Sequence, residues 1–81
     1  MAINLKKDDA ITHYNIANLY RKIGNYDLAI KHYEFVIRLK EDKGLDIGSL
    51  YIDSMINIGI CFKNRGLYED AITIYEKVNQ I

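Results

Sequence analysis

Proline is absent from this chain and cysteine occurs once, and each scarcity limits the classes of fold and of function that are possible. A single cysteine, Cys61, excludes an internal disulfide framework and a cysteine-based zinc site. With no proline and only five glycines in 81 residues, the sequence predicts few turns and long regular elements. No apolar run approaches the roughly 18 residues of a membrane-spanning helix, so no membrane partner is expected. The first residues do not resemble a secretory signal, so a reducing cytoplasm is the expected location.

An excess of charge of either sign is also missing. Eleven Lys and Arg residues balance eleven Asp and Glu residues, which gives a formal net charge of zero. Proteins that bind nucleic acids usually carry a basic patch and a high pI, so nucleic acid is not an expected partner. The same balance leaves little repulsion between copies of the chain, which favours self-association.

Residues with catalytic or metal-binding chemistry are few. His13 and His32 fall on different expected helices, and neither has a second His or Cys at metal-ligand spacing. Cys61 has no histidine nearby in the sequence and is expected to be a small core residue. No glycine-rich phosphate-binding loop is present, because Gly24 and Gly66 stand alone. The sequence therefore predicts a protein that is not an enzyme and that holds no metal and no cofactor.

What the chain does contain is an internal repeat. When residues 13–39 are laid over residues 55–81, a shift of 42, nine of the 27 positions are identical. In each copy, apolar residues recur at the spacing of an amphipathic helix before and after a glycine, Gly24 or Gly66, at which a helix can end. Each copy thus reads as helix, tight turn, helix. We expect an all-α fold of four antiparallel helices at about 8–23, 26–42, 49–65 and 68–80.

The positions shared by the copies resemble the motif of the tetratricopeptide repeat family. The first copy matches it at Ala17, Tyr20, Gly24, Tyr26, Ala29, Tyr33 and Val36, and the second at Gly59, Phe62, Gly66, Tyr68, Ala71, Tyr75 and Val78. The resemblance implies a single domain over 1–81 in an α-solenoid arrangement, with one repeat at about 10–41 and the other at about 52–81. It also implies a module that binds a protein or peptide rather than an enzyme.

Two features depart from the family pattern. The proline that usually follows the second helix is replaced by Glu41, and the period is 42 residues instead of 34. The extra residues form a linker or helix extension at about 42–51, and without the proline the second helix is expected to extend to residue 43. Gly44 and Gly48 indicate a break in that stretch, and Ser49 is the expected cap of the third helix.

In the family, the first helix of each repeat builds the concave surface that binds partners. By resemblance, we expect this first-helix face to hold the partner site, formed by Tyr14, Asn15, Asn18, Arg21, Lys22, Ile56, Asn57, Ile60 and Lys63, flanked by Ile11 and Asp53. Asn18 and Asn57 fit the family scheme that grips a peptide backbone or terminal carboxylate, whereas Tyr14 stands where a lysine of that scheme is expected. The alternative is that these asparagines are ordinary repeat residues on a solvated face.

Self-association is a second expectation. The third helix carries apolar residues nearly all the way round, and two repeats without a polar capping helix are too few to cover it. A homo-oligomer, in its simplest form a symmetric dimer with Ile56, Ile60 or the last helix through Ile81 in the interface, would supply the cover. An exchange of repeats between chains is a second route to self-association. For the function, the alternatives to an interaction module are a structural fragment of a longer repeat array with no ligand of its own and, less favoured, a helix-turn-helix nucleic-acid binder.

Overall fold

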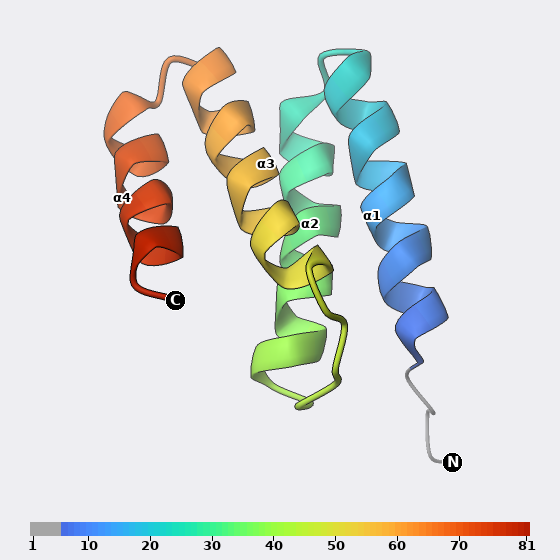
Figure 1. Ribbon diagram of the computed structural model, residues 1–81. Helices are drawn as coiled ribbons and strands as arrows, with labels where there is room; N and C mark the ends of the chain where they lie inside the picture. Colours follow the sequence, from blue (N-terminus) through green and yellow to red (C-terminus); the bar gives the residue numbers. More distant parts are fainter. Residues whose placement is uncertain (1–5) are drawn as a thin grey trace.

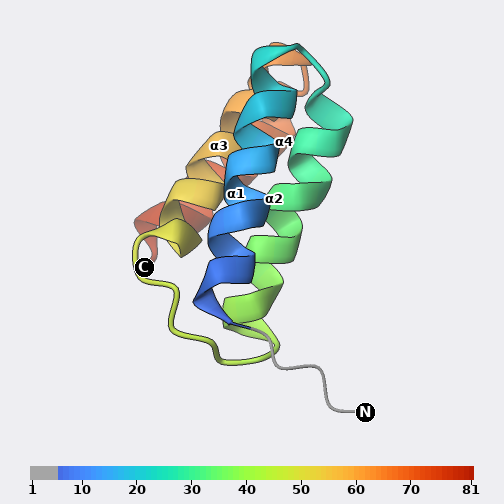
Figure 2. The same cartoon turned by 90° about the vertical axis from the view of Figure 1, so that its right-hand side faces the viewer.

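Four helices, set side by side in chain order, make up the fold (Figure 1). The computed structural model describes residues 6–81, and its helices are α1 (Lys7–Lys22), α2 (Tyr26–Glu41), α3 (Leu50–Asn64) and α4 (Tyr68–Asn79). Each helix runs antiparallel to the next, and α1 also touches α3. Viewed from the α1 side, α4 lies farthest from the viewer (Figure 2). The all-α expectation is confirmed, and the expected ends of the four helices lie within one residue of the observed ones, apart from the expected extension of the second helix to residue 43.

The turns at Gly24 and Gly66 share one geometry. Both glycines have a positive φ, 83° and 80°. In the first turn Asn25 N–H donates to the Tyr20 carbonyl and Gly24 N–H to that of Arg21, and the second turn repeats this pattern 42 residues later. This is the Schellman arrangement, in which glycine takes the left-handed position that other residues adopt only with strain. The two hairpins therefore begin from the same local structure.

The region between the repeats corrects two expectations. Helix α2 ends at Glu41 and does not extend to residue 43, because the chain turns at Gly44, where φ is 67°. A helix can end at a proline or at a glycine in the left-handed conformation, and here the glycine ends α2 although the proline is missing. Ser49 precedes α3 but makes no side-chain capping hydrogen bond, so the expected cap is absent. By contrast, the Asn25 side chain caps α2, accepting a hydrogen bond from Leu28 N–H at 3.3 Å.

Two clusters of buried side chains hold the helices together. The larger cluster draws on both repeats, and the smaller one joins α1 and α2 to the loop before α3 through Ile47, which is buried. Ala29 and Ala71, at matching positions of the two repeats, are both buried. The larger cluster consists of Ala17, Ala29, Ile30, Tyr33, Ile37, Met55, Ile58 and Cys61.

Glu41, at the position of the family's proline, links three helices. Its carboxylate accepts a hydrogen bond from the Tyr51 hydroxyl on α3 and one from Lys77 Nζ on α4, at 3.1 Å for the lysine. The hydrogen bond from Tyr51 lowers the pKa of Glu41. Desolvation and the neighbouring carboxylate raise the pKa of Tyr51 to about 12. Because these side chains are partly exposed, the ion pair is a small contribution to stability.

Most of α3 is covered within the chain itself, which corrects the expectation that another molecule must enclose it. Met55, Ile58 and Cys61 are buried against neighbouring helices. Ile56 is the large apolar residue of α3 that stays exposed, at 38%. Among residues 6–81, no helix is both long and apolar enough to cross a lipid bilayer.

Close packing of α3 on α4 generates the first prediction. A Cβ atom added at Gly59 would lie 2.5 Å from Tyr75 Cε1 and 3.1 Å from Ile74 Cγ2. Overpacking outweighs the helix propensity gained, so Gly59→Ala should lower the free energy of unfolding by about 1–2 kcal/mol. Urea denaturation measures this change.

The control is the same substitution in a Tyr75→Leu background, which removes the obstructing ring. There, Gly59→Ala should be neutral or stabilising. An equal loss of stability in both backgrounds would show that the ring of Tyr75 is not the obstacle.

Candidate partner-binding face

Helices α1 and α3 both pack on α2 and also contact each other, so the first-helix face runs over two neighbouring helices (Figure 1). One hydrogen bond joins the two repeats directly across it. Asn57 Nδ2 donates to the Tyr14 hydroxyl oxygen at 3.1 Å and to the backbone carbonyl of Asp53 at 3.0 Å. The structure therefore places Tyr14 and Asn57 in contact, and the face runs continuously from one repeat to the next.

A second polar network lies under the same face and centres on Tyr33 of α2. The buried Tyr33 hydroxyl donates to Asn18 Oδ1 and accepts from Arg21 Nε at 3.3 Å. Burial raises the pKa of the Tyr33 hydroxyl, and the hydrogen bond to that hydroxyl raises the pKa of Arg21. Asn18 and Arg21 are thus brought together by a core residue, and both are half-buried.

These bonds change how the two asparagines are interpreted. The side-chain oxygen of Asn18 and the amide nitrogen of Asn57 are engaged within the fold, so they stabilise the packing of the helices. We therefore expect replacement of either asparagine to lower the stability of the fold. The sequence could not reveal this, because it does not show which hydroxyl each amide meets.

The remaining residues of the first-helix face divide into exposed and half-buried groups. Asn15, Ile56 and Lys63 are exposed, and Ile60 is half-buried. Lys22 is exposed at the border of the face, where it lines a shallow hollow on the outer side of α1. The accessible chemistry of the face is therefore apolar in the middle of α3, with one amide and basic side chains around it.

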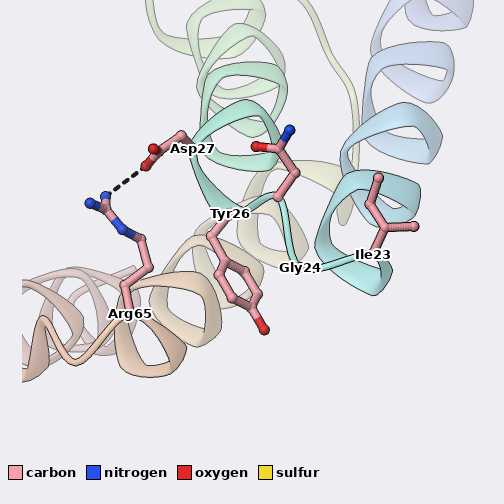
Figure 3. Close-up of a pocket in the computed structure, with 6 residues that line it drawn as sticks. Ile23, Gly24, Tyr26, Asp27 and Arg65 are labelled. Carbon is pink, nitrogen blue, oxygen red and sulfur yellow. Dashed lines mark ion pairs between the residues drawn. The ribbon is translucent and has the colours of Figure 1, made fainter.

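Another hollow lies where the α1–α2 turn meets the end of α3 (Figure 3). Arg65, directly after α3, reaches Asp27 of α2 there, with Nη1 2.7 Å from Oδ1. Both side chains are largely exposed, so this pair adds little stability. Among residues 6–81, no group of three or more His, Cys, Asp or Glu side chains is placed to hold a metal ion.

The structure also brings together two residues that the sequence analysis kept apart. His13 Nδ1 and His32 Nδ1 are 2.9 Å apart, in a hydrogen bond between α1 and α2. His13 packs on Phe35 with ring centroids 4.0 Å apart, and His32 stacks on Tyr20 at 5.6 Å. The signal that could have found the pair is the hairpin itself, since both residues lie about two to three helical turns from Gly24.

The histidine pair predicts a pH dependence of stability. Burial, and then the nearby His32, lower the pKa of His13, while Asp9 opposes the shift. A lowered pKa means that the unfolded chain binds a proton more readily than the folded one. The free energy of unfolding should therefore fall as the pH drops through about 6.5 and below, and His13 should contribute no slope well above that pH.

Denaturation at several pH values between 5 and 8 measures the slope. His13→Gln keeps a polar side chain that does not titrate, so it should flatten the profile around pH 6. An unchanged profile in this variant would show that His13 is not the responsible group.

The bond between the repeats gives another prediction. Asn57→Ala should lower the free energy of unfolding by about 1 kcal/mol, and Tyr14→Phe by a similar amount. The double variant should lose less than the sum, because both changes remove the same hydrogen bond. Asn15→Ala is the matched control on the same face and should change stability by less than about 0.5 kcal/mol. Strict additivity would contradict the coupling.

Comparisons with known proteins agree with this architecture. A family model described as "Tetratricopeptide repeat" matches residues 8–80, nearly the whole chain. A human protein named "Intraflagellar transport protein 88 homolog" is 38% identical over 69 residues, which are 84% of this chain. The chain spans only 8% of the length of that relative. No solved structure matches significantly. The fold agrees with the match over residues 8–80, because it consists of two helix hairpins that each turn at a glycine. The chain belongs to the tetratricopeptide repeat family.

Proposed function

We propose that the chain is a non-enzymatic interaction module that binds an extended protein segment on the first-helix face. The observation that carries the proposal is the continuity of this face, because the Asn57–Tyr14 hydrogen bond holds α1 and α3 in fixed register. A face that is already held in place loses less conformational entropy when a segment binds to it than a mobile face would. Family membership supports the same class of function.

The side chains of the face favour a segment that combines apolar and acidic residues. Ile56 offers exposed apolar surface, and Lys63 lies on α3 within two turns of it. Lys22 adds a second positive charge at the border with the outer side of α1. An acidic residue on the partner would meet these cations, and salt would weaken that attraction. A cytoplasmic location is proposed with it, supported by a sequence with one cysteine, which is buried.

One segment of a longer repeat array is the second candidate function. The observation that favours it is the human relative, of which the chain covers 8%. In such an array the same first-helix face would continue over further repeats. The two candidates differ in whether this chain binds a segment alone.

A peptide test separates them. Peptides with an apolar centre and flanking glutamates, selected from a displayed library, should bind the chain, and fluorescence anisotropy gives the affinity. Ile56→Glu and Lys63→Glu should each weaken binding by roughly threefold or more, because each places a negative charge against the acidic probe. Binding should also weaken as salt is raised.

Thr73→Glu is the control, since it introduces the same charge at an exposed position of α4. It should bind the selected peptide like the unmodified chain. If Ile56→Glu and Lys63→Glu bind as tightly as this control, the first-helix face is not the binding surface.

A further inference from the structure

The largest apolar exposure among residues 6–81 lies on the two outer helices. Leu19 of α1 and the adjoining Ile23 are 63% and 75% exposed, and Tyr68 and Ile72 of α4 are 64% and 55% exposed. Leu19 and Ile23 line a hollow together with Ile16 and Tyr20. We call Ile16, Leu19 and Ile23 the head face, and Tyr68 and Ile72 the tail face. A further helix packed against the head face or the tail face could bury this exposed apolar surface.

The internal repeat indicates what kind of surface each end fits. The 42-residue shift places Ile16 and Leu19 of the head face on Ile58 and Cys61 of α3. Both α3 residues are buried in the larger cluster, to which α2 contributes four of the eight side chains. The head face is therefore the uncovered counterpart of the α3 surface on which α2 packs.

The same shift relates the tail face to α2. Ile72 falls on Ile30, which is 7% exposed, and Tyr68 falls on Tyr26, which packs against the larger cluster. The tail face is thus the uncovered counterpart of the α2 surface that α3 covers. The tail face and the head face therefore correspond to the two sides of the α2–α3 junction, which the molecule already forms once internally.

We propose that a second copy of the chain covers the head face, with the tail face of one copy packed on the head face of the next. The contact repeats the α2–α3 junction between molecules, and it is independent of peptide binding on the first-helix face. Because the head face and the tail face are different surfaces, two copies in contact still leave one head face and one tail face uncovered, at opposite ends of the pair. Association then continues into open chains instead of closing as a symmetric dimer.

Charge supports the same pairing. At the internal junction Asp27 of α2 meets Arg65, which directly follows α3. The counterpart of Asp27 is Glu69, in the first turn of α4, and the counterpart of Arg65 is Ile23. Lys22, beside Ile23, lines the head hollow and supplies a positive charge for Glu69. A formal net charge of zero leaves no overall repulsion between copies.

Differences from the internal junction affect how tightly the copies fit. Leu19 is larger than its counterpart Cys61, and Ile23 is apolar where Arg65 is charged. Both changes enlarge the apolar area of the head face. The contact between molecules should therefore depend more on apolar burial than the internal junction does, and less on an ion pair.

Two substitutions separate this contact from any symmetric one. Leu19→Glu blocks the head face and Ile72→Glu blocks the tail face, and both side chains are exposed, so the fold should survive. The weight-average mass of the unmodified chain, measured by sedimentation from low to high micromolar concentration, should rise beyond that of a dimer. Each variant alone should stay monomeric over that range, with association weakened at least about tenfold.

Mixing the two variants is the decisive step. The intact tail of Leu19→Glu can meet the intact head of Ile72→Glu, so an equimolar mixture should form a one-to-one dimer and nothing larger. Ile56→Glu is the control, because Ile56 lies on the first-helix face and outside the contact. It should associate like the unmodified chain, and circular dichroism should show helical content equal to that of the unmodified chain in all variants.

Four results would each overturn the proposal. They are an unmodified chain that stays monomeric at high micromolar concentration, one whose mass stops at a dimer, a single blocked variant that still associates, and a mixture that stays monomeric. A mass that stops at a dimer and is abolished by Ile56→Glu would instead identify the symmetric contact through α3.

Discussion

Burial of Tyr33 is the constraint on which the rest of this structure depends. Its side chain is fully enclosed, so its hydroxyl must find partners inside the protein, and it does so with Asn18 and Arg21 of α1. The ring meets Tyr14 edge-on, with centroids 5.8 Å apart, and Tyr14 in turn accepts the hydrogen bond from Asn57 of α3. One side chain of α2 thus fixes α1 and, through Tyr14, the register of the second repeat.

The two repeats share a motif but differ in how well it is buried. Tyr33 is enclosed, whereas its counterpart Tyr75 is half-buried and rests on Gly59. The difference follows from position in the row of helices. Helix α2 has a neighbour on each side, whereas α4 contacts only α3 among the helices of residues 6–81. Local sequence therefore sets the shape of each hairpin, and the neighbouring repeat sets how much of that hairpin is buried.

Sequence reasoning succeeded where structure depends on local periodicity. The spacing of apolar residues and the glycines at 24 and 66 predict four helices and two turns, because short-range geometry decides both. It failed where the outcome depends on which side chains meet across helices. Asn57 and Tyr14 are 43 residues apart, and His13 and His32 come from different helices. The covering of α3 was misjudged for the same reason, since helical periodicity does not show how much neighbouring helices enclose.

The loop between the repeats has a consequence for how the molecule comes apart. Ile47 is buried against Ala10, Val36 and Leu39, so the eight residues beyond the usual period contribute a core of their own at the junction. The larger cluster also takes side chains from both hairpins. In a repeat array, the interface between units determines whether neighbours melt separately or together. With so much of its interior shared, we expect this pair of repeats to unfold as one cooperative unit, because neither hairpin would keep an intact core without the other.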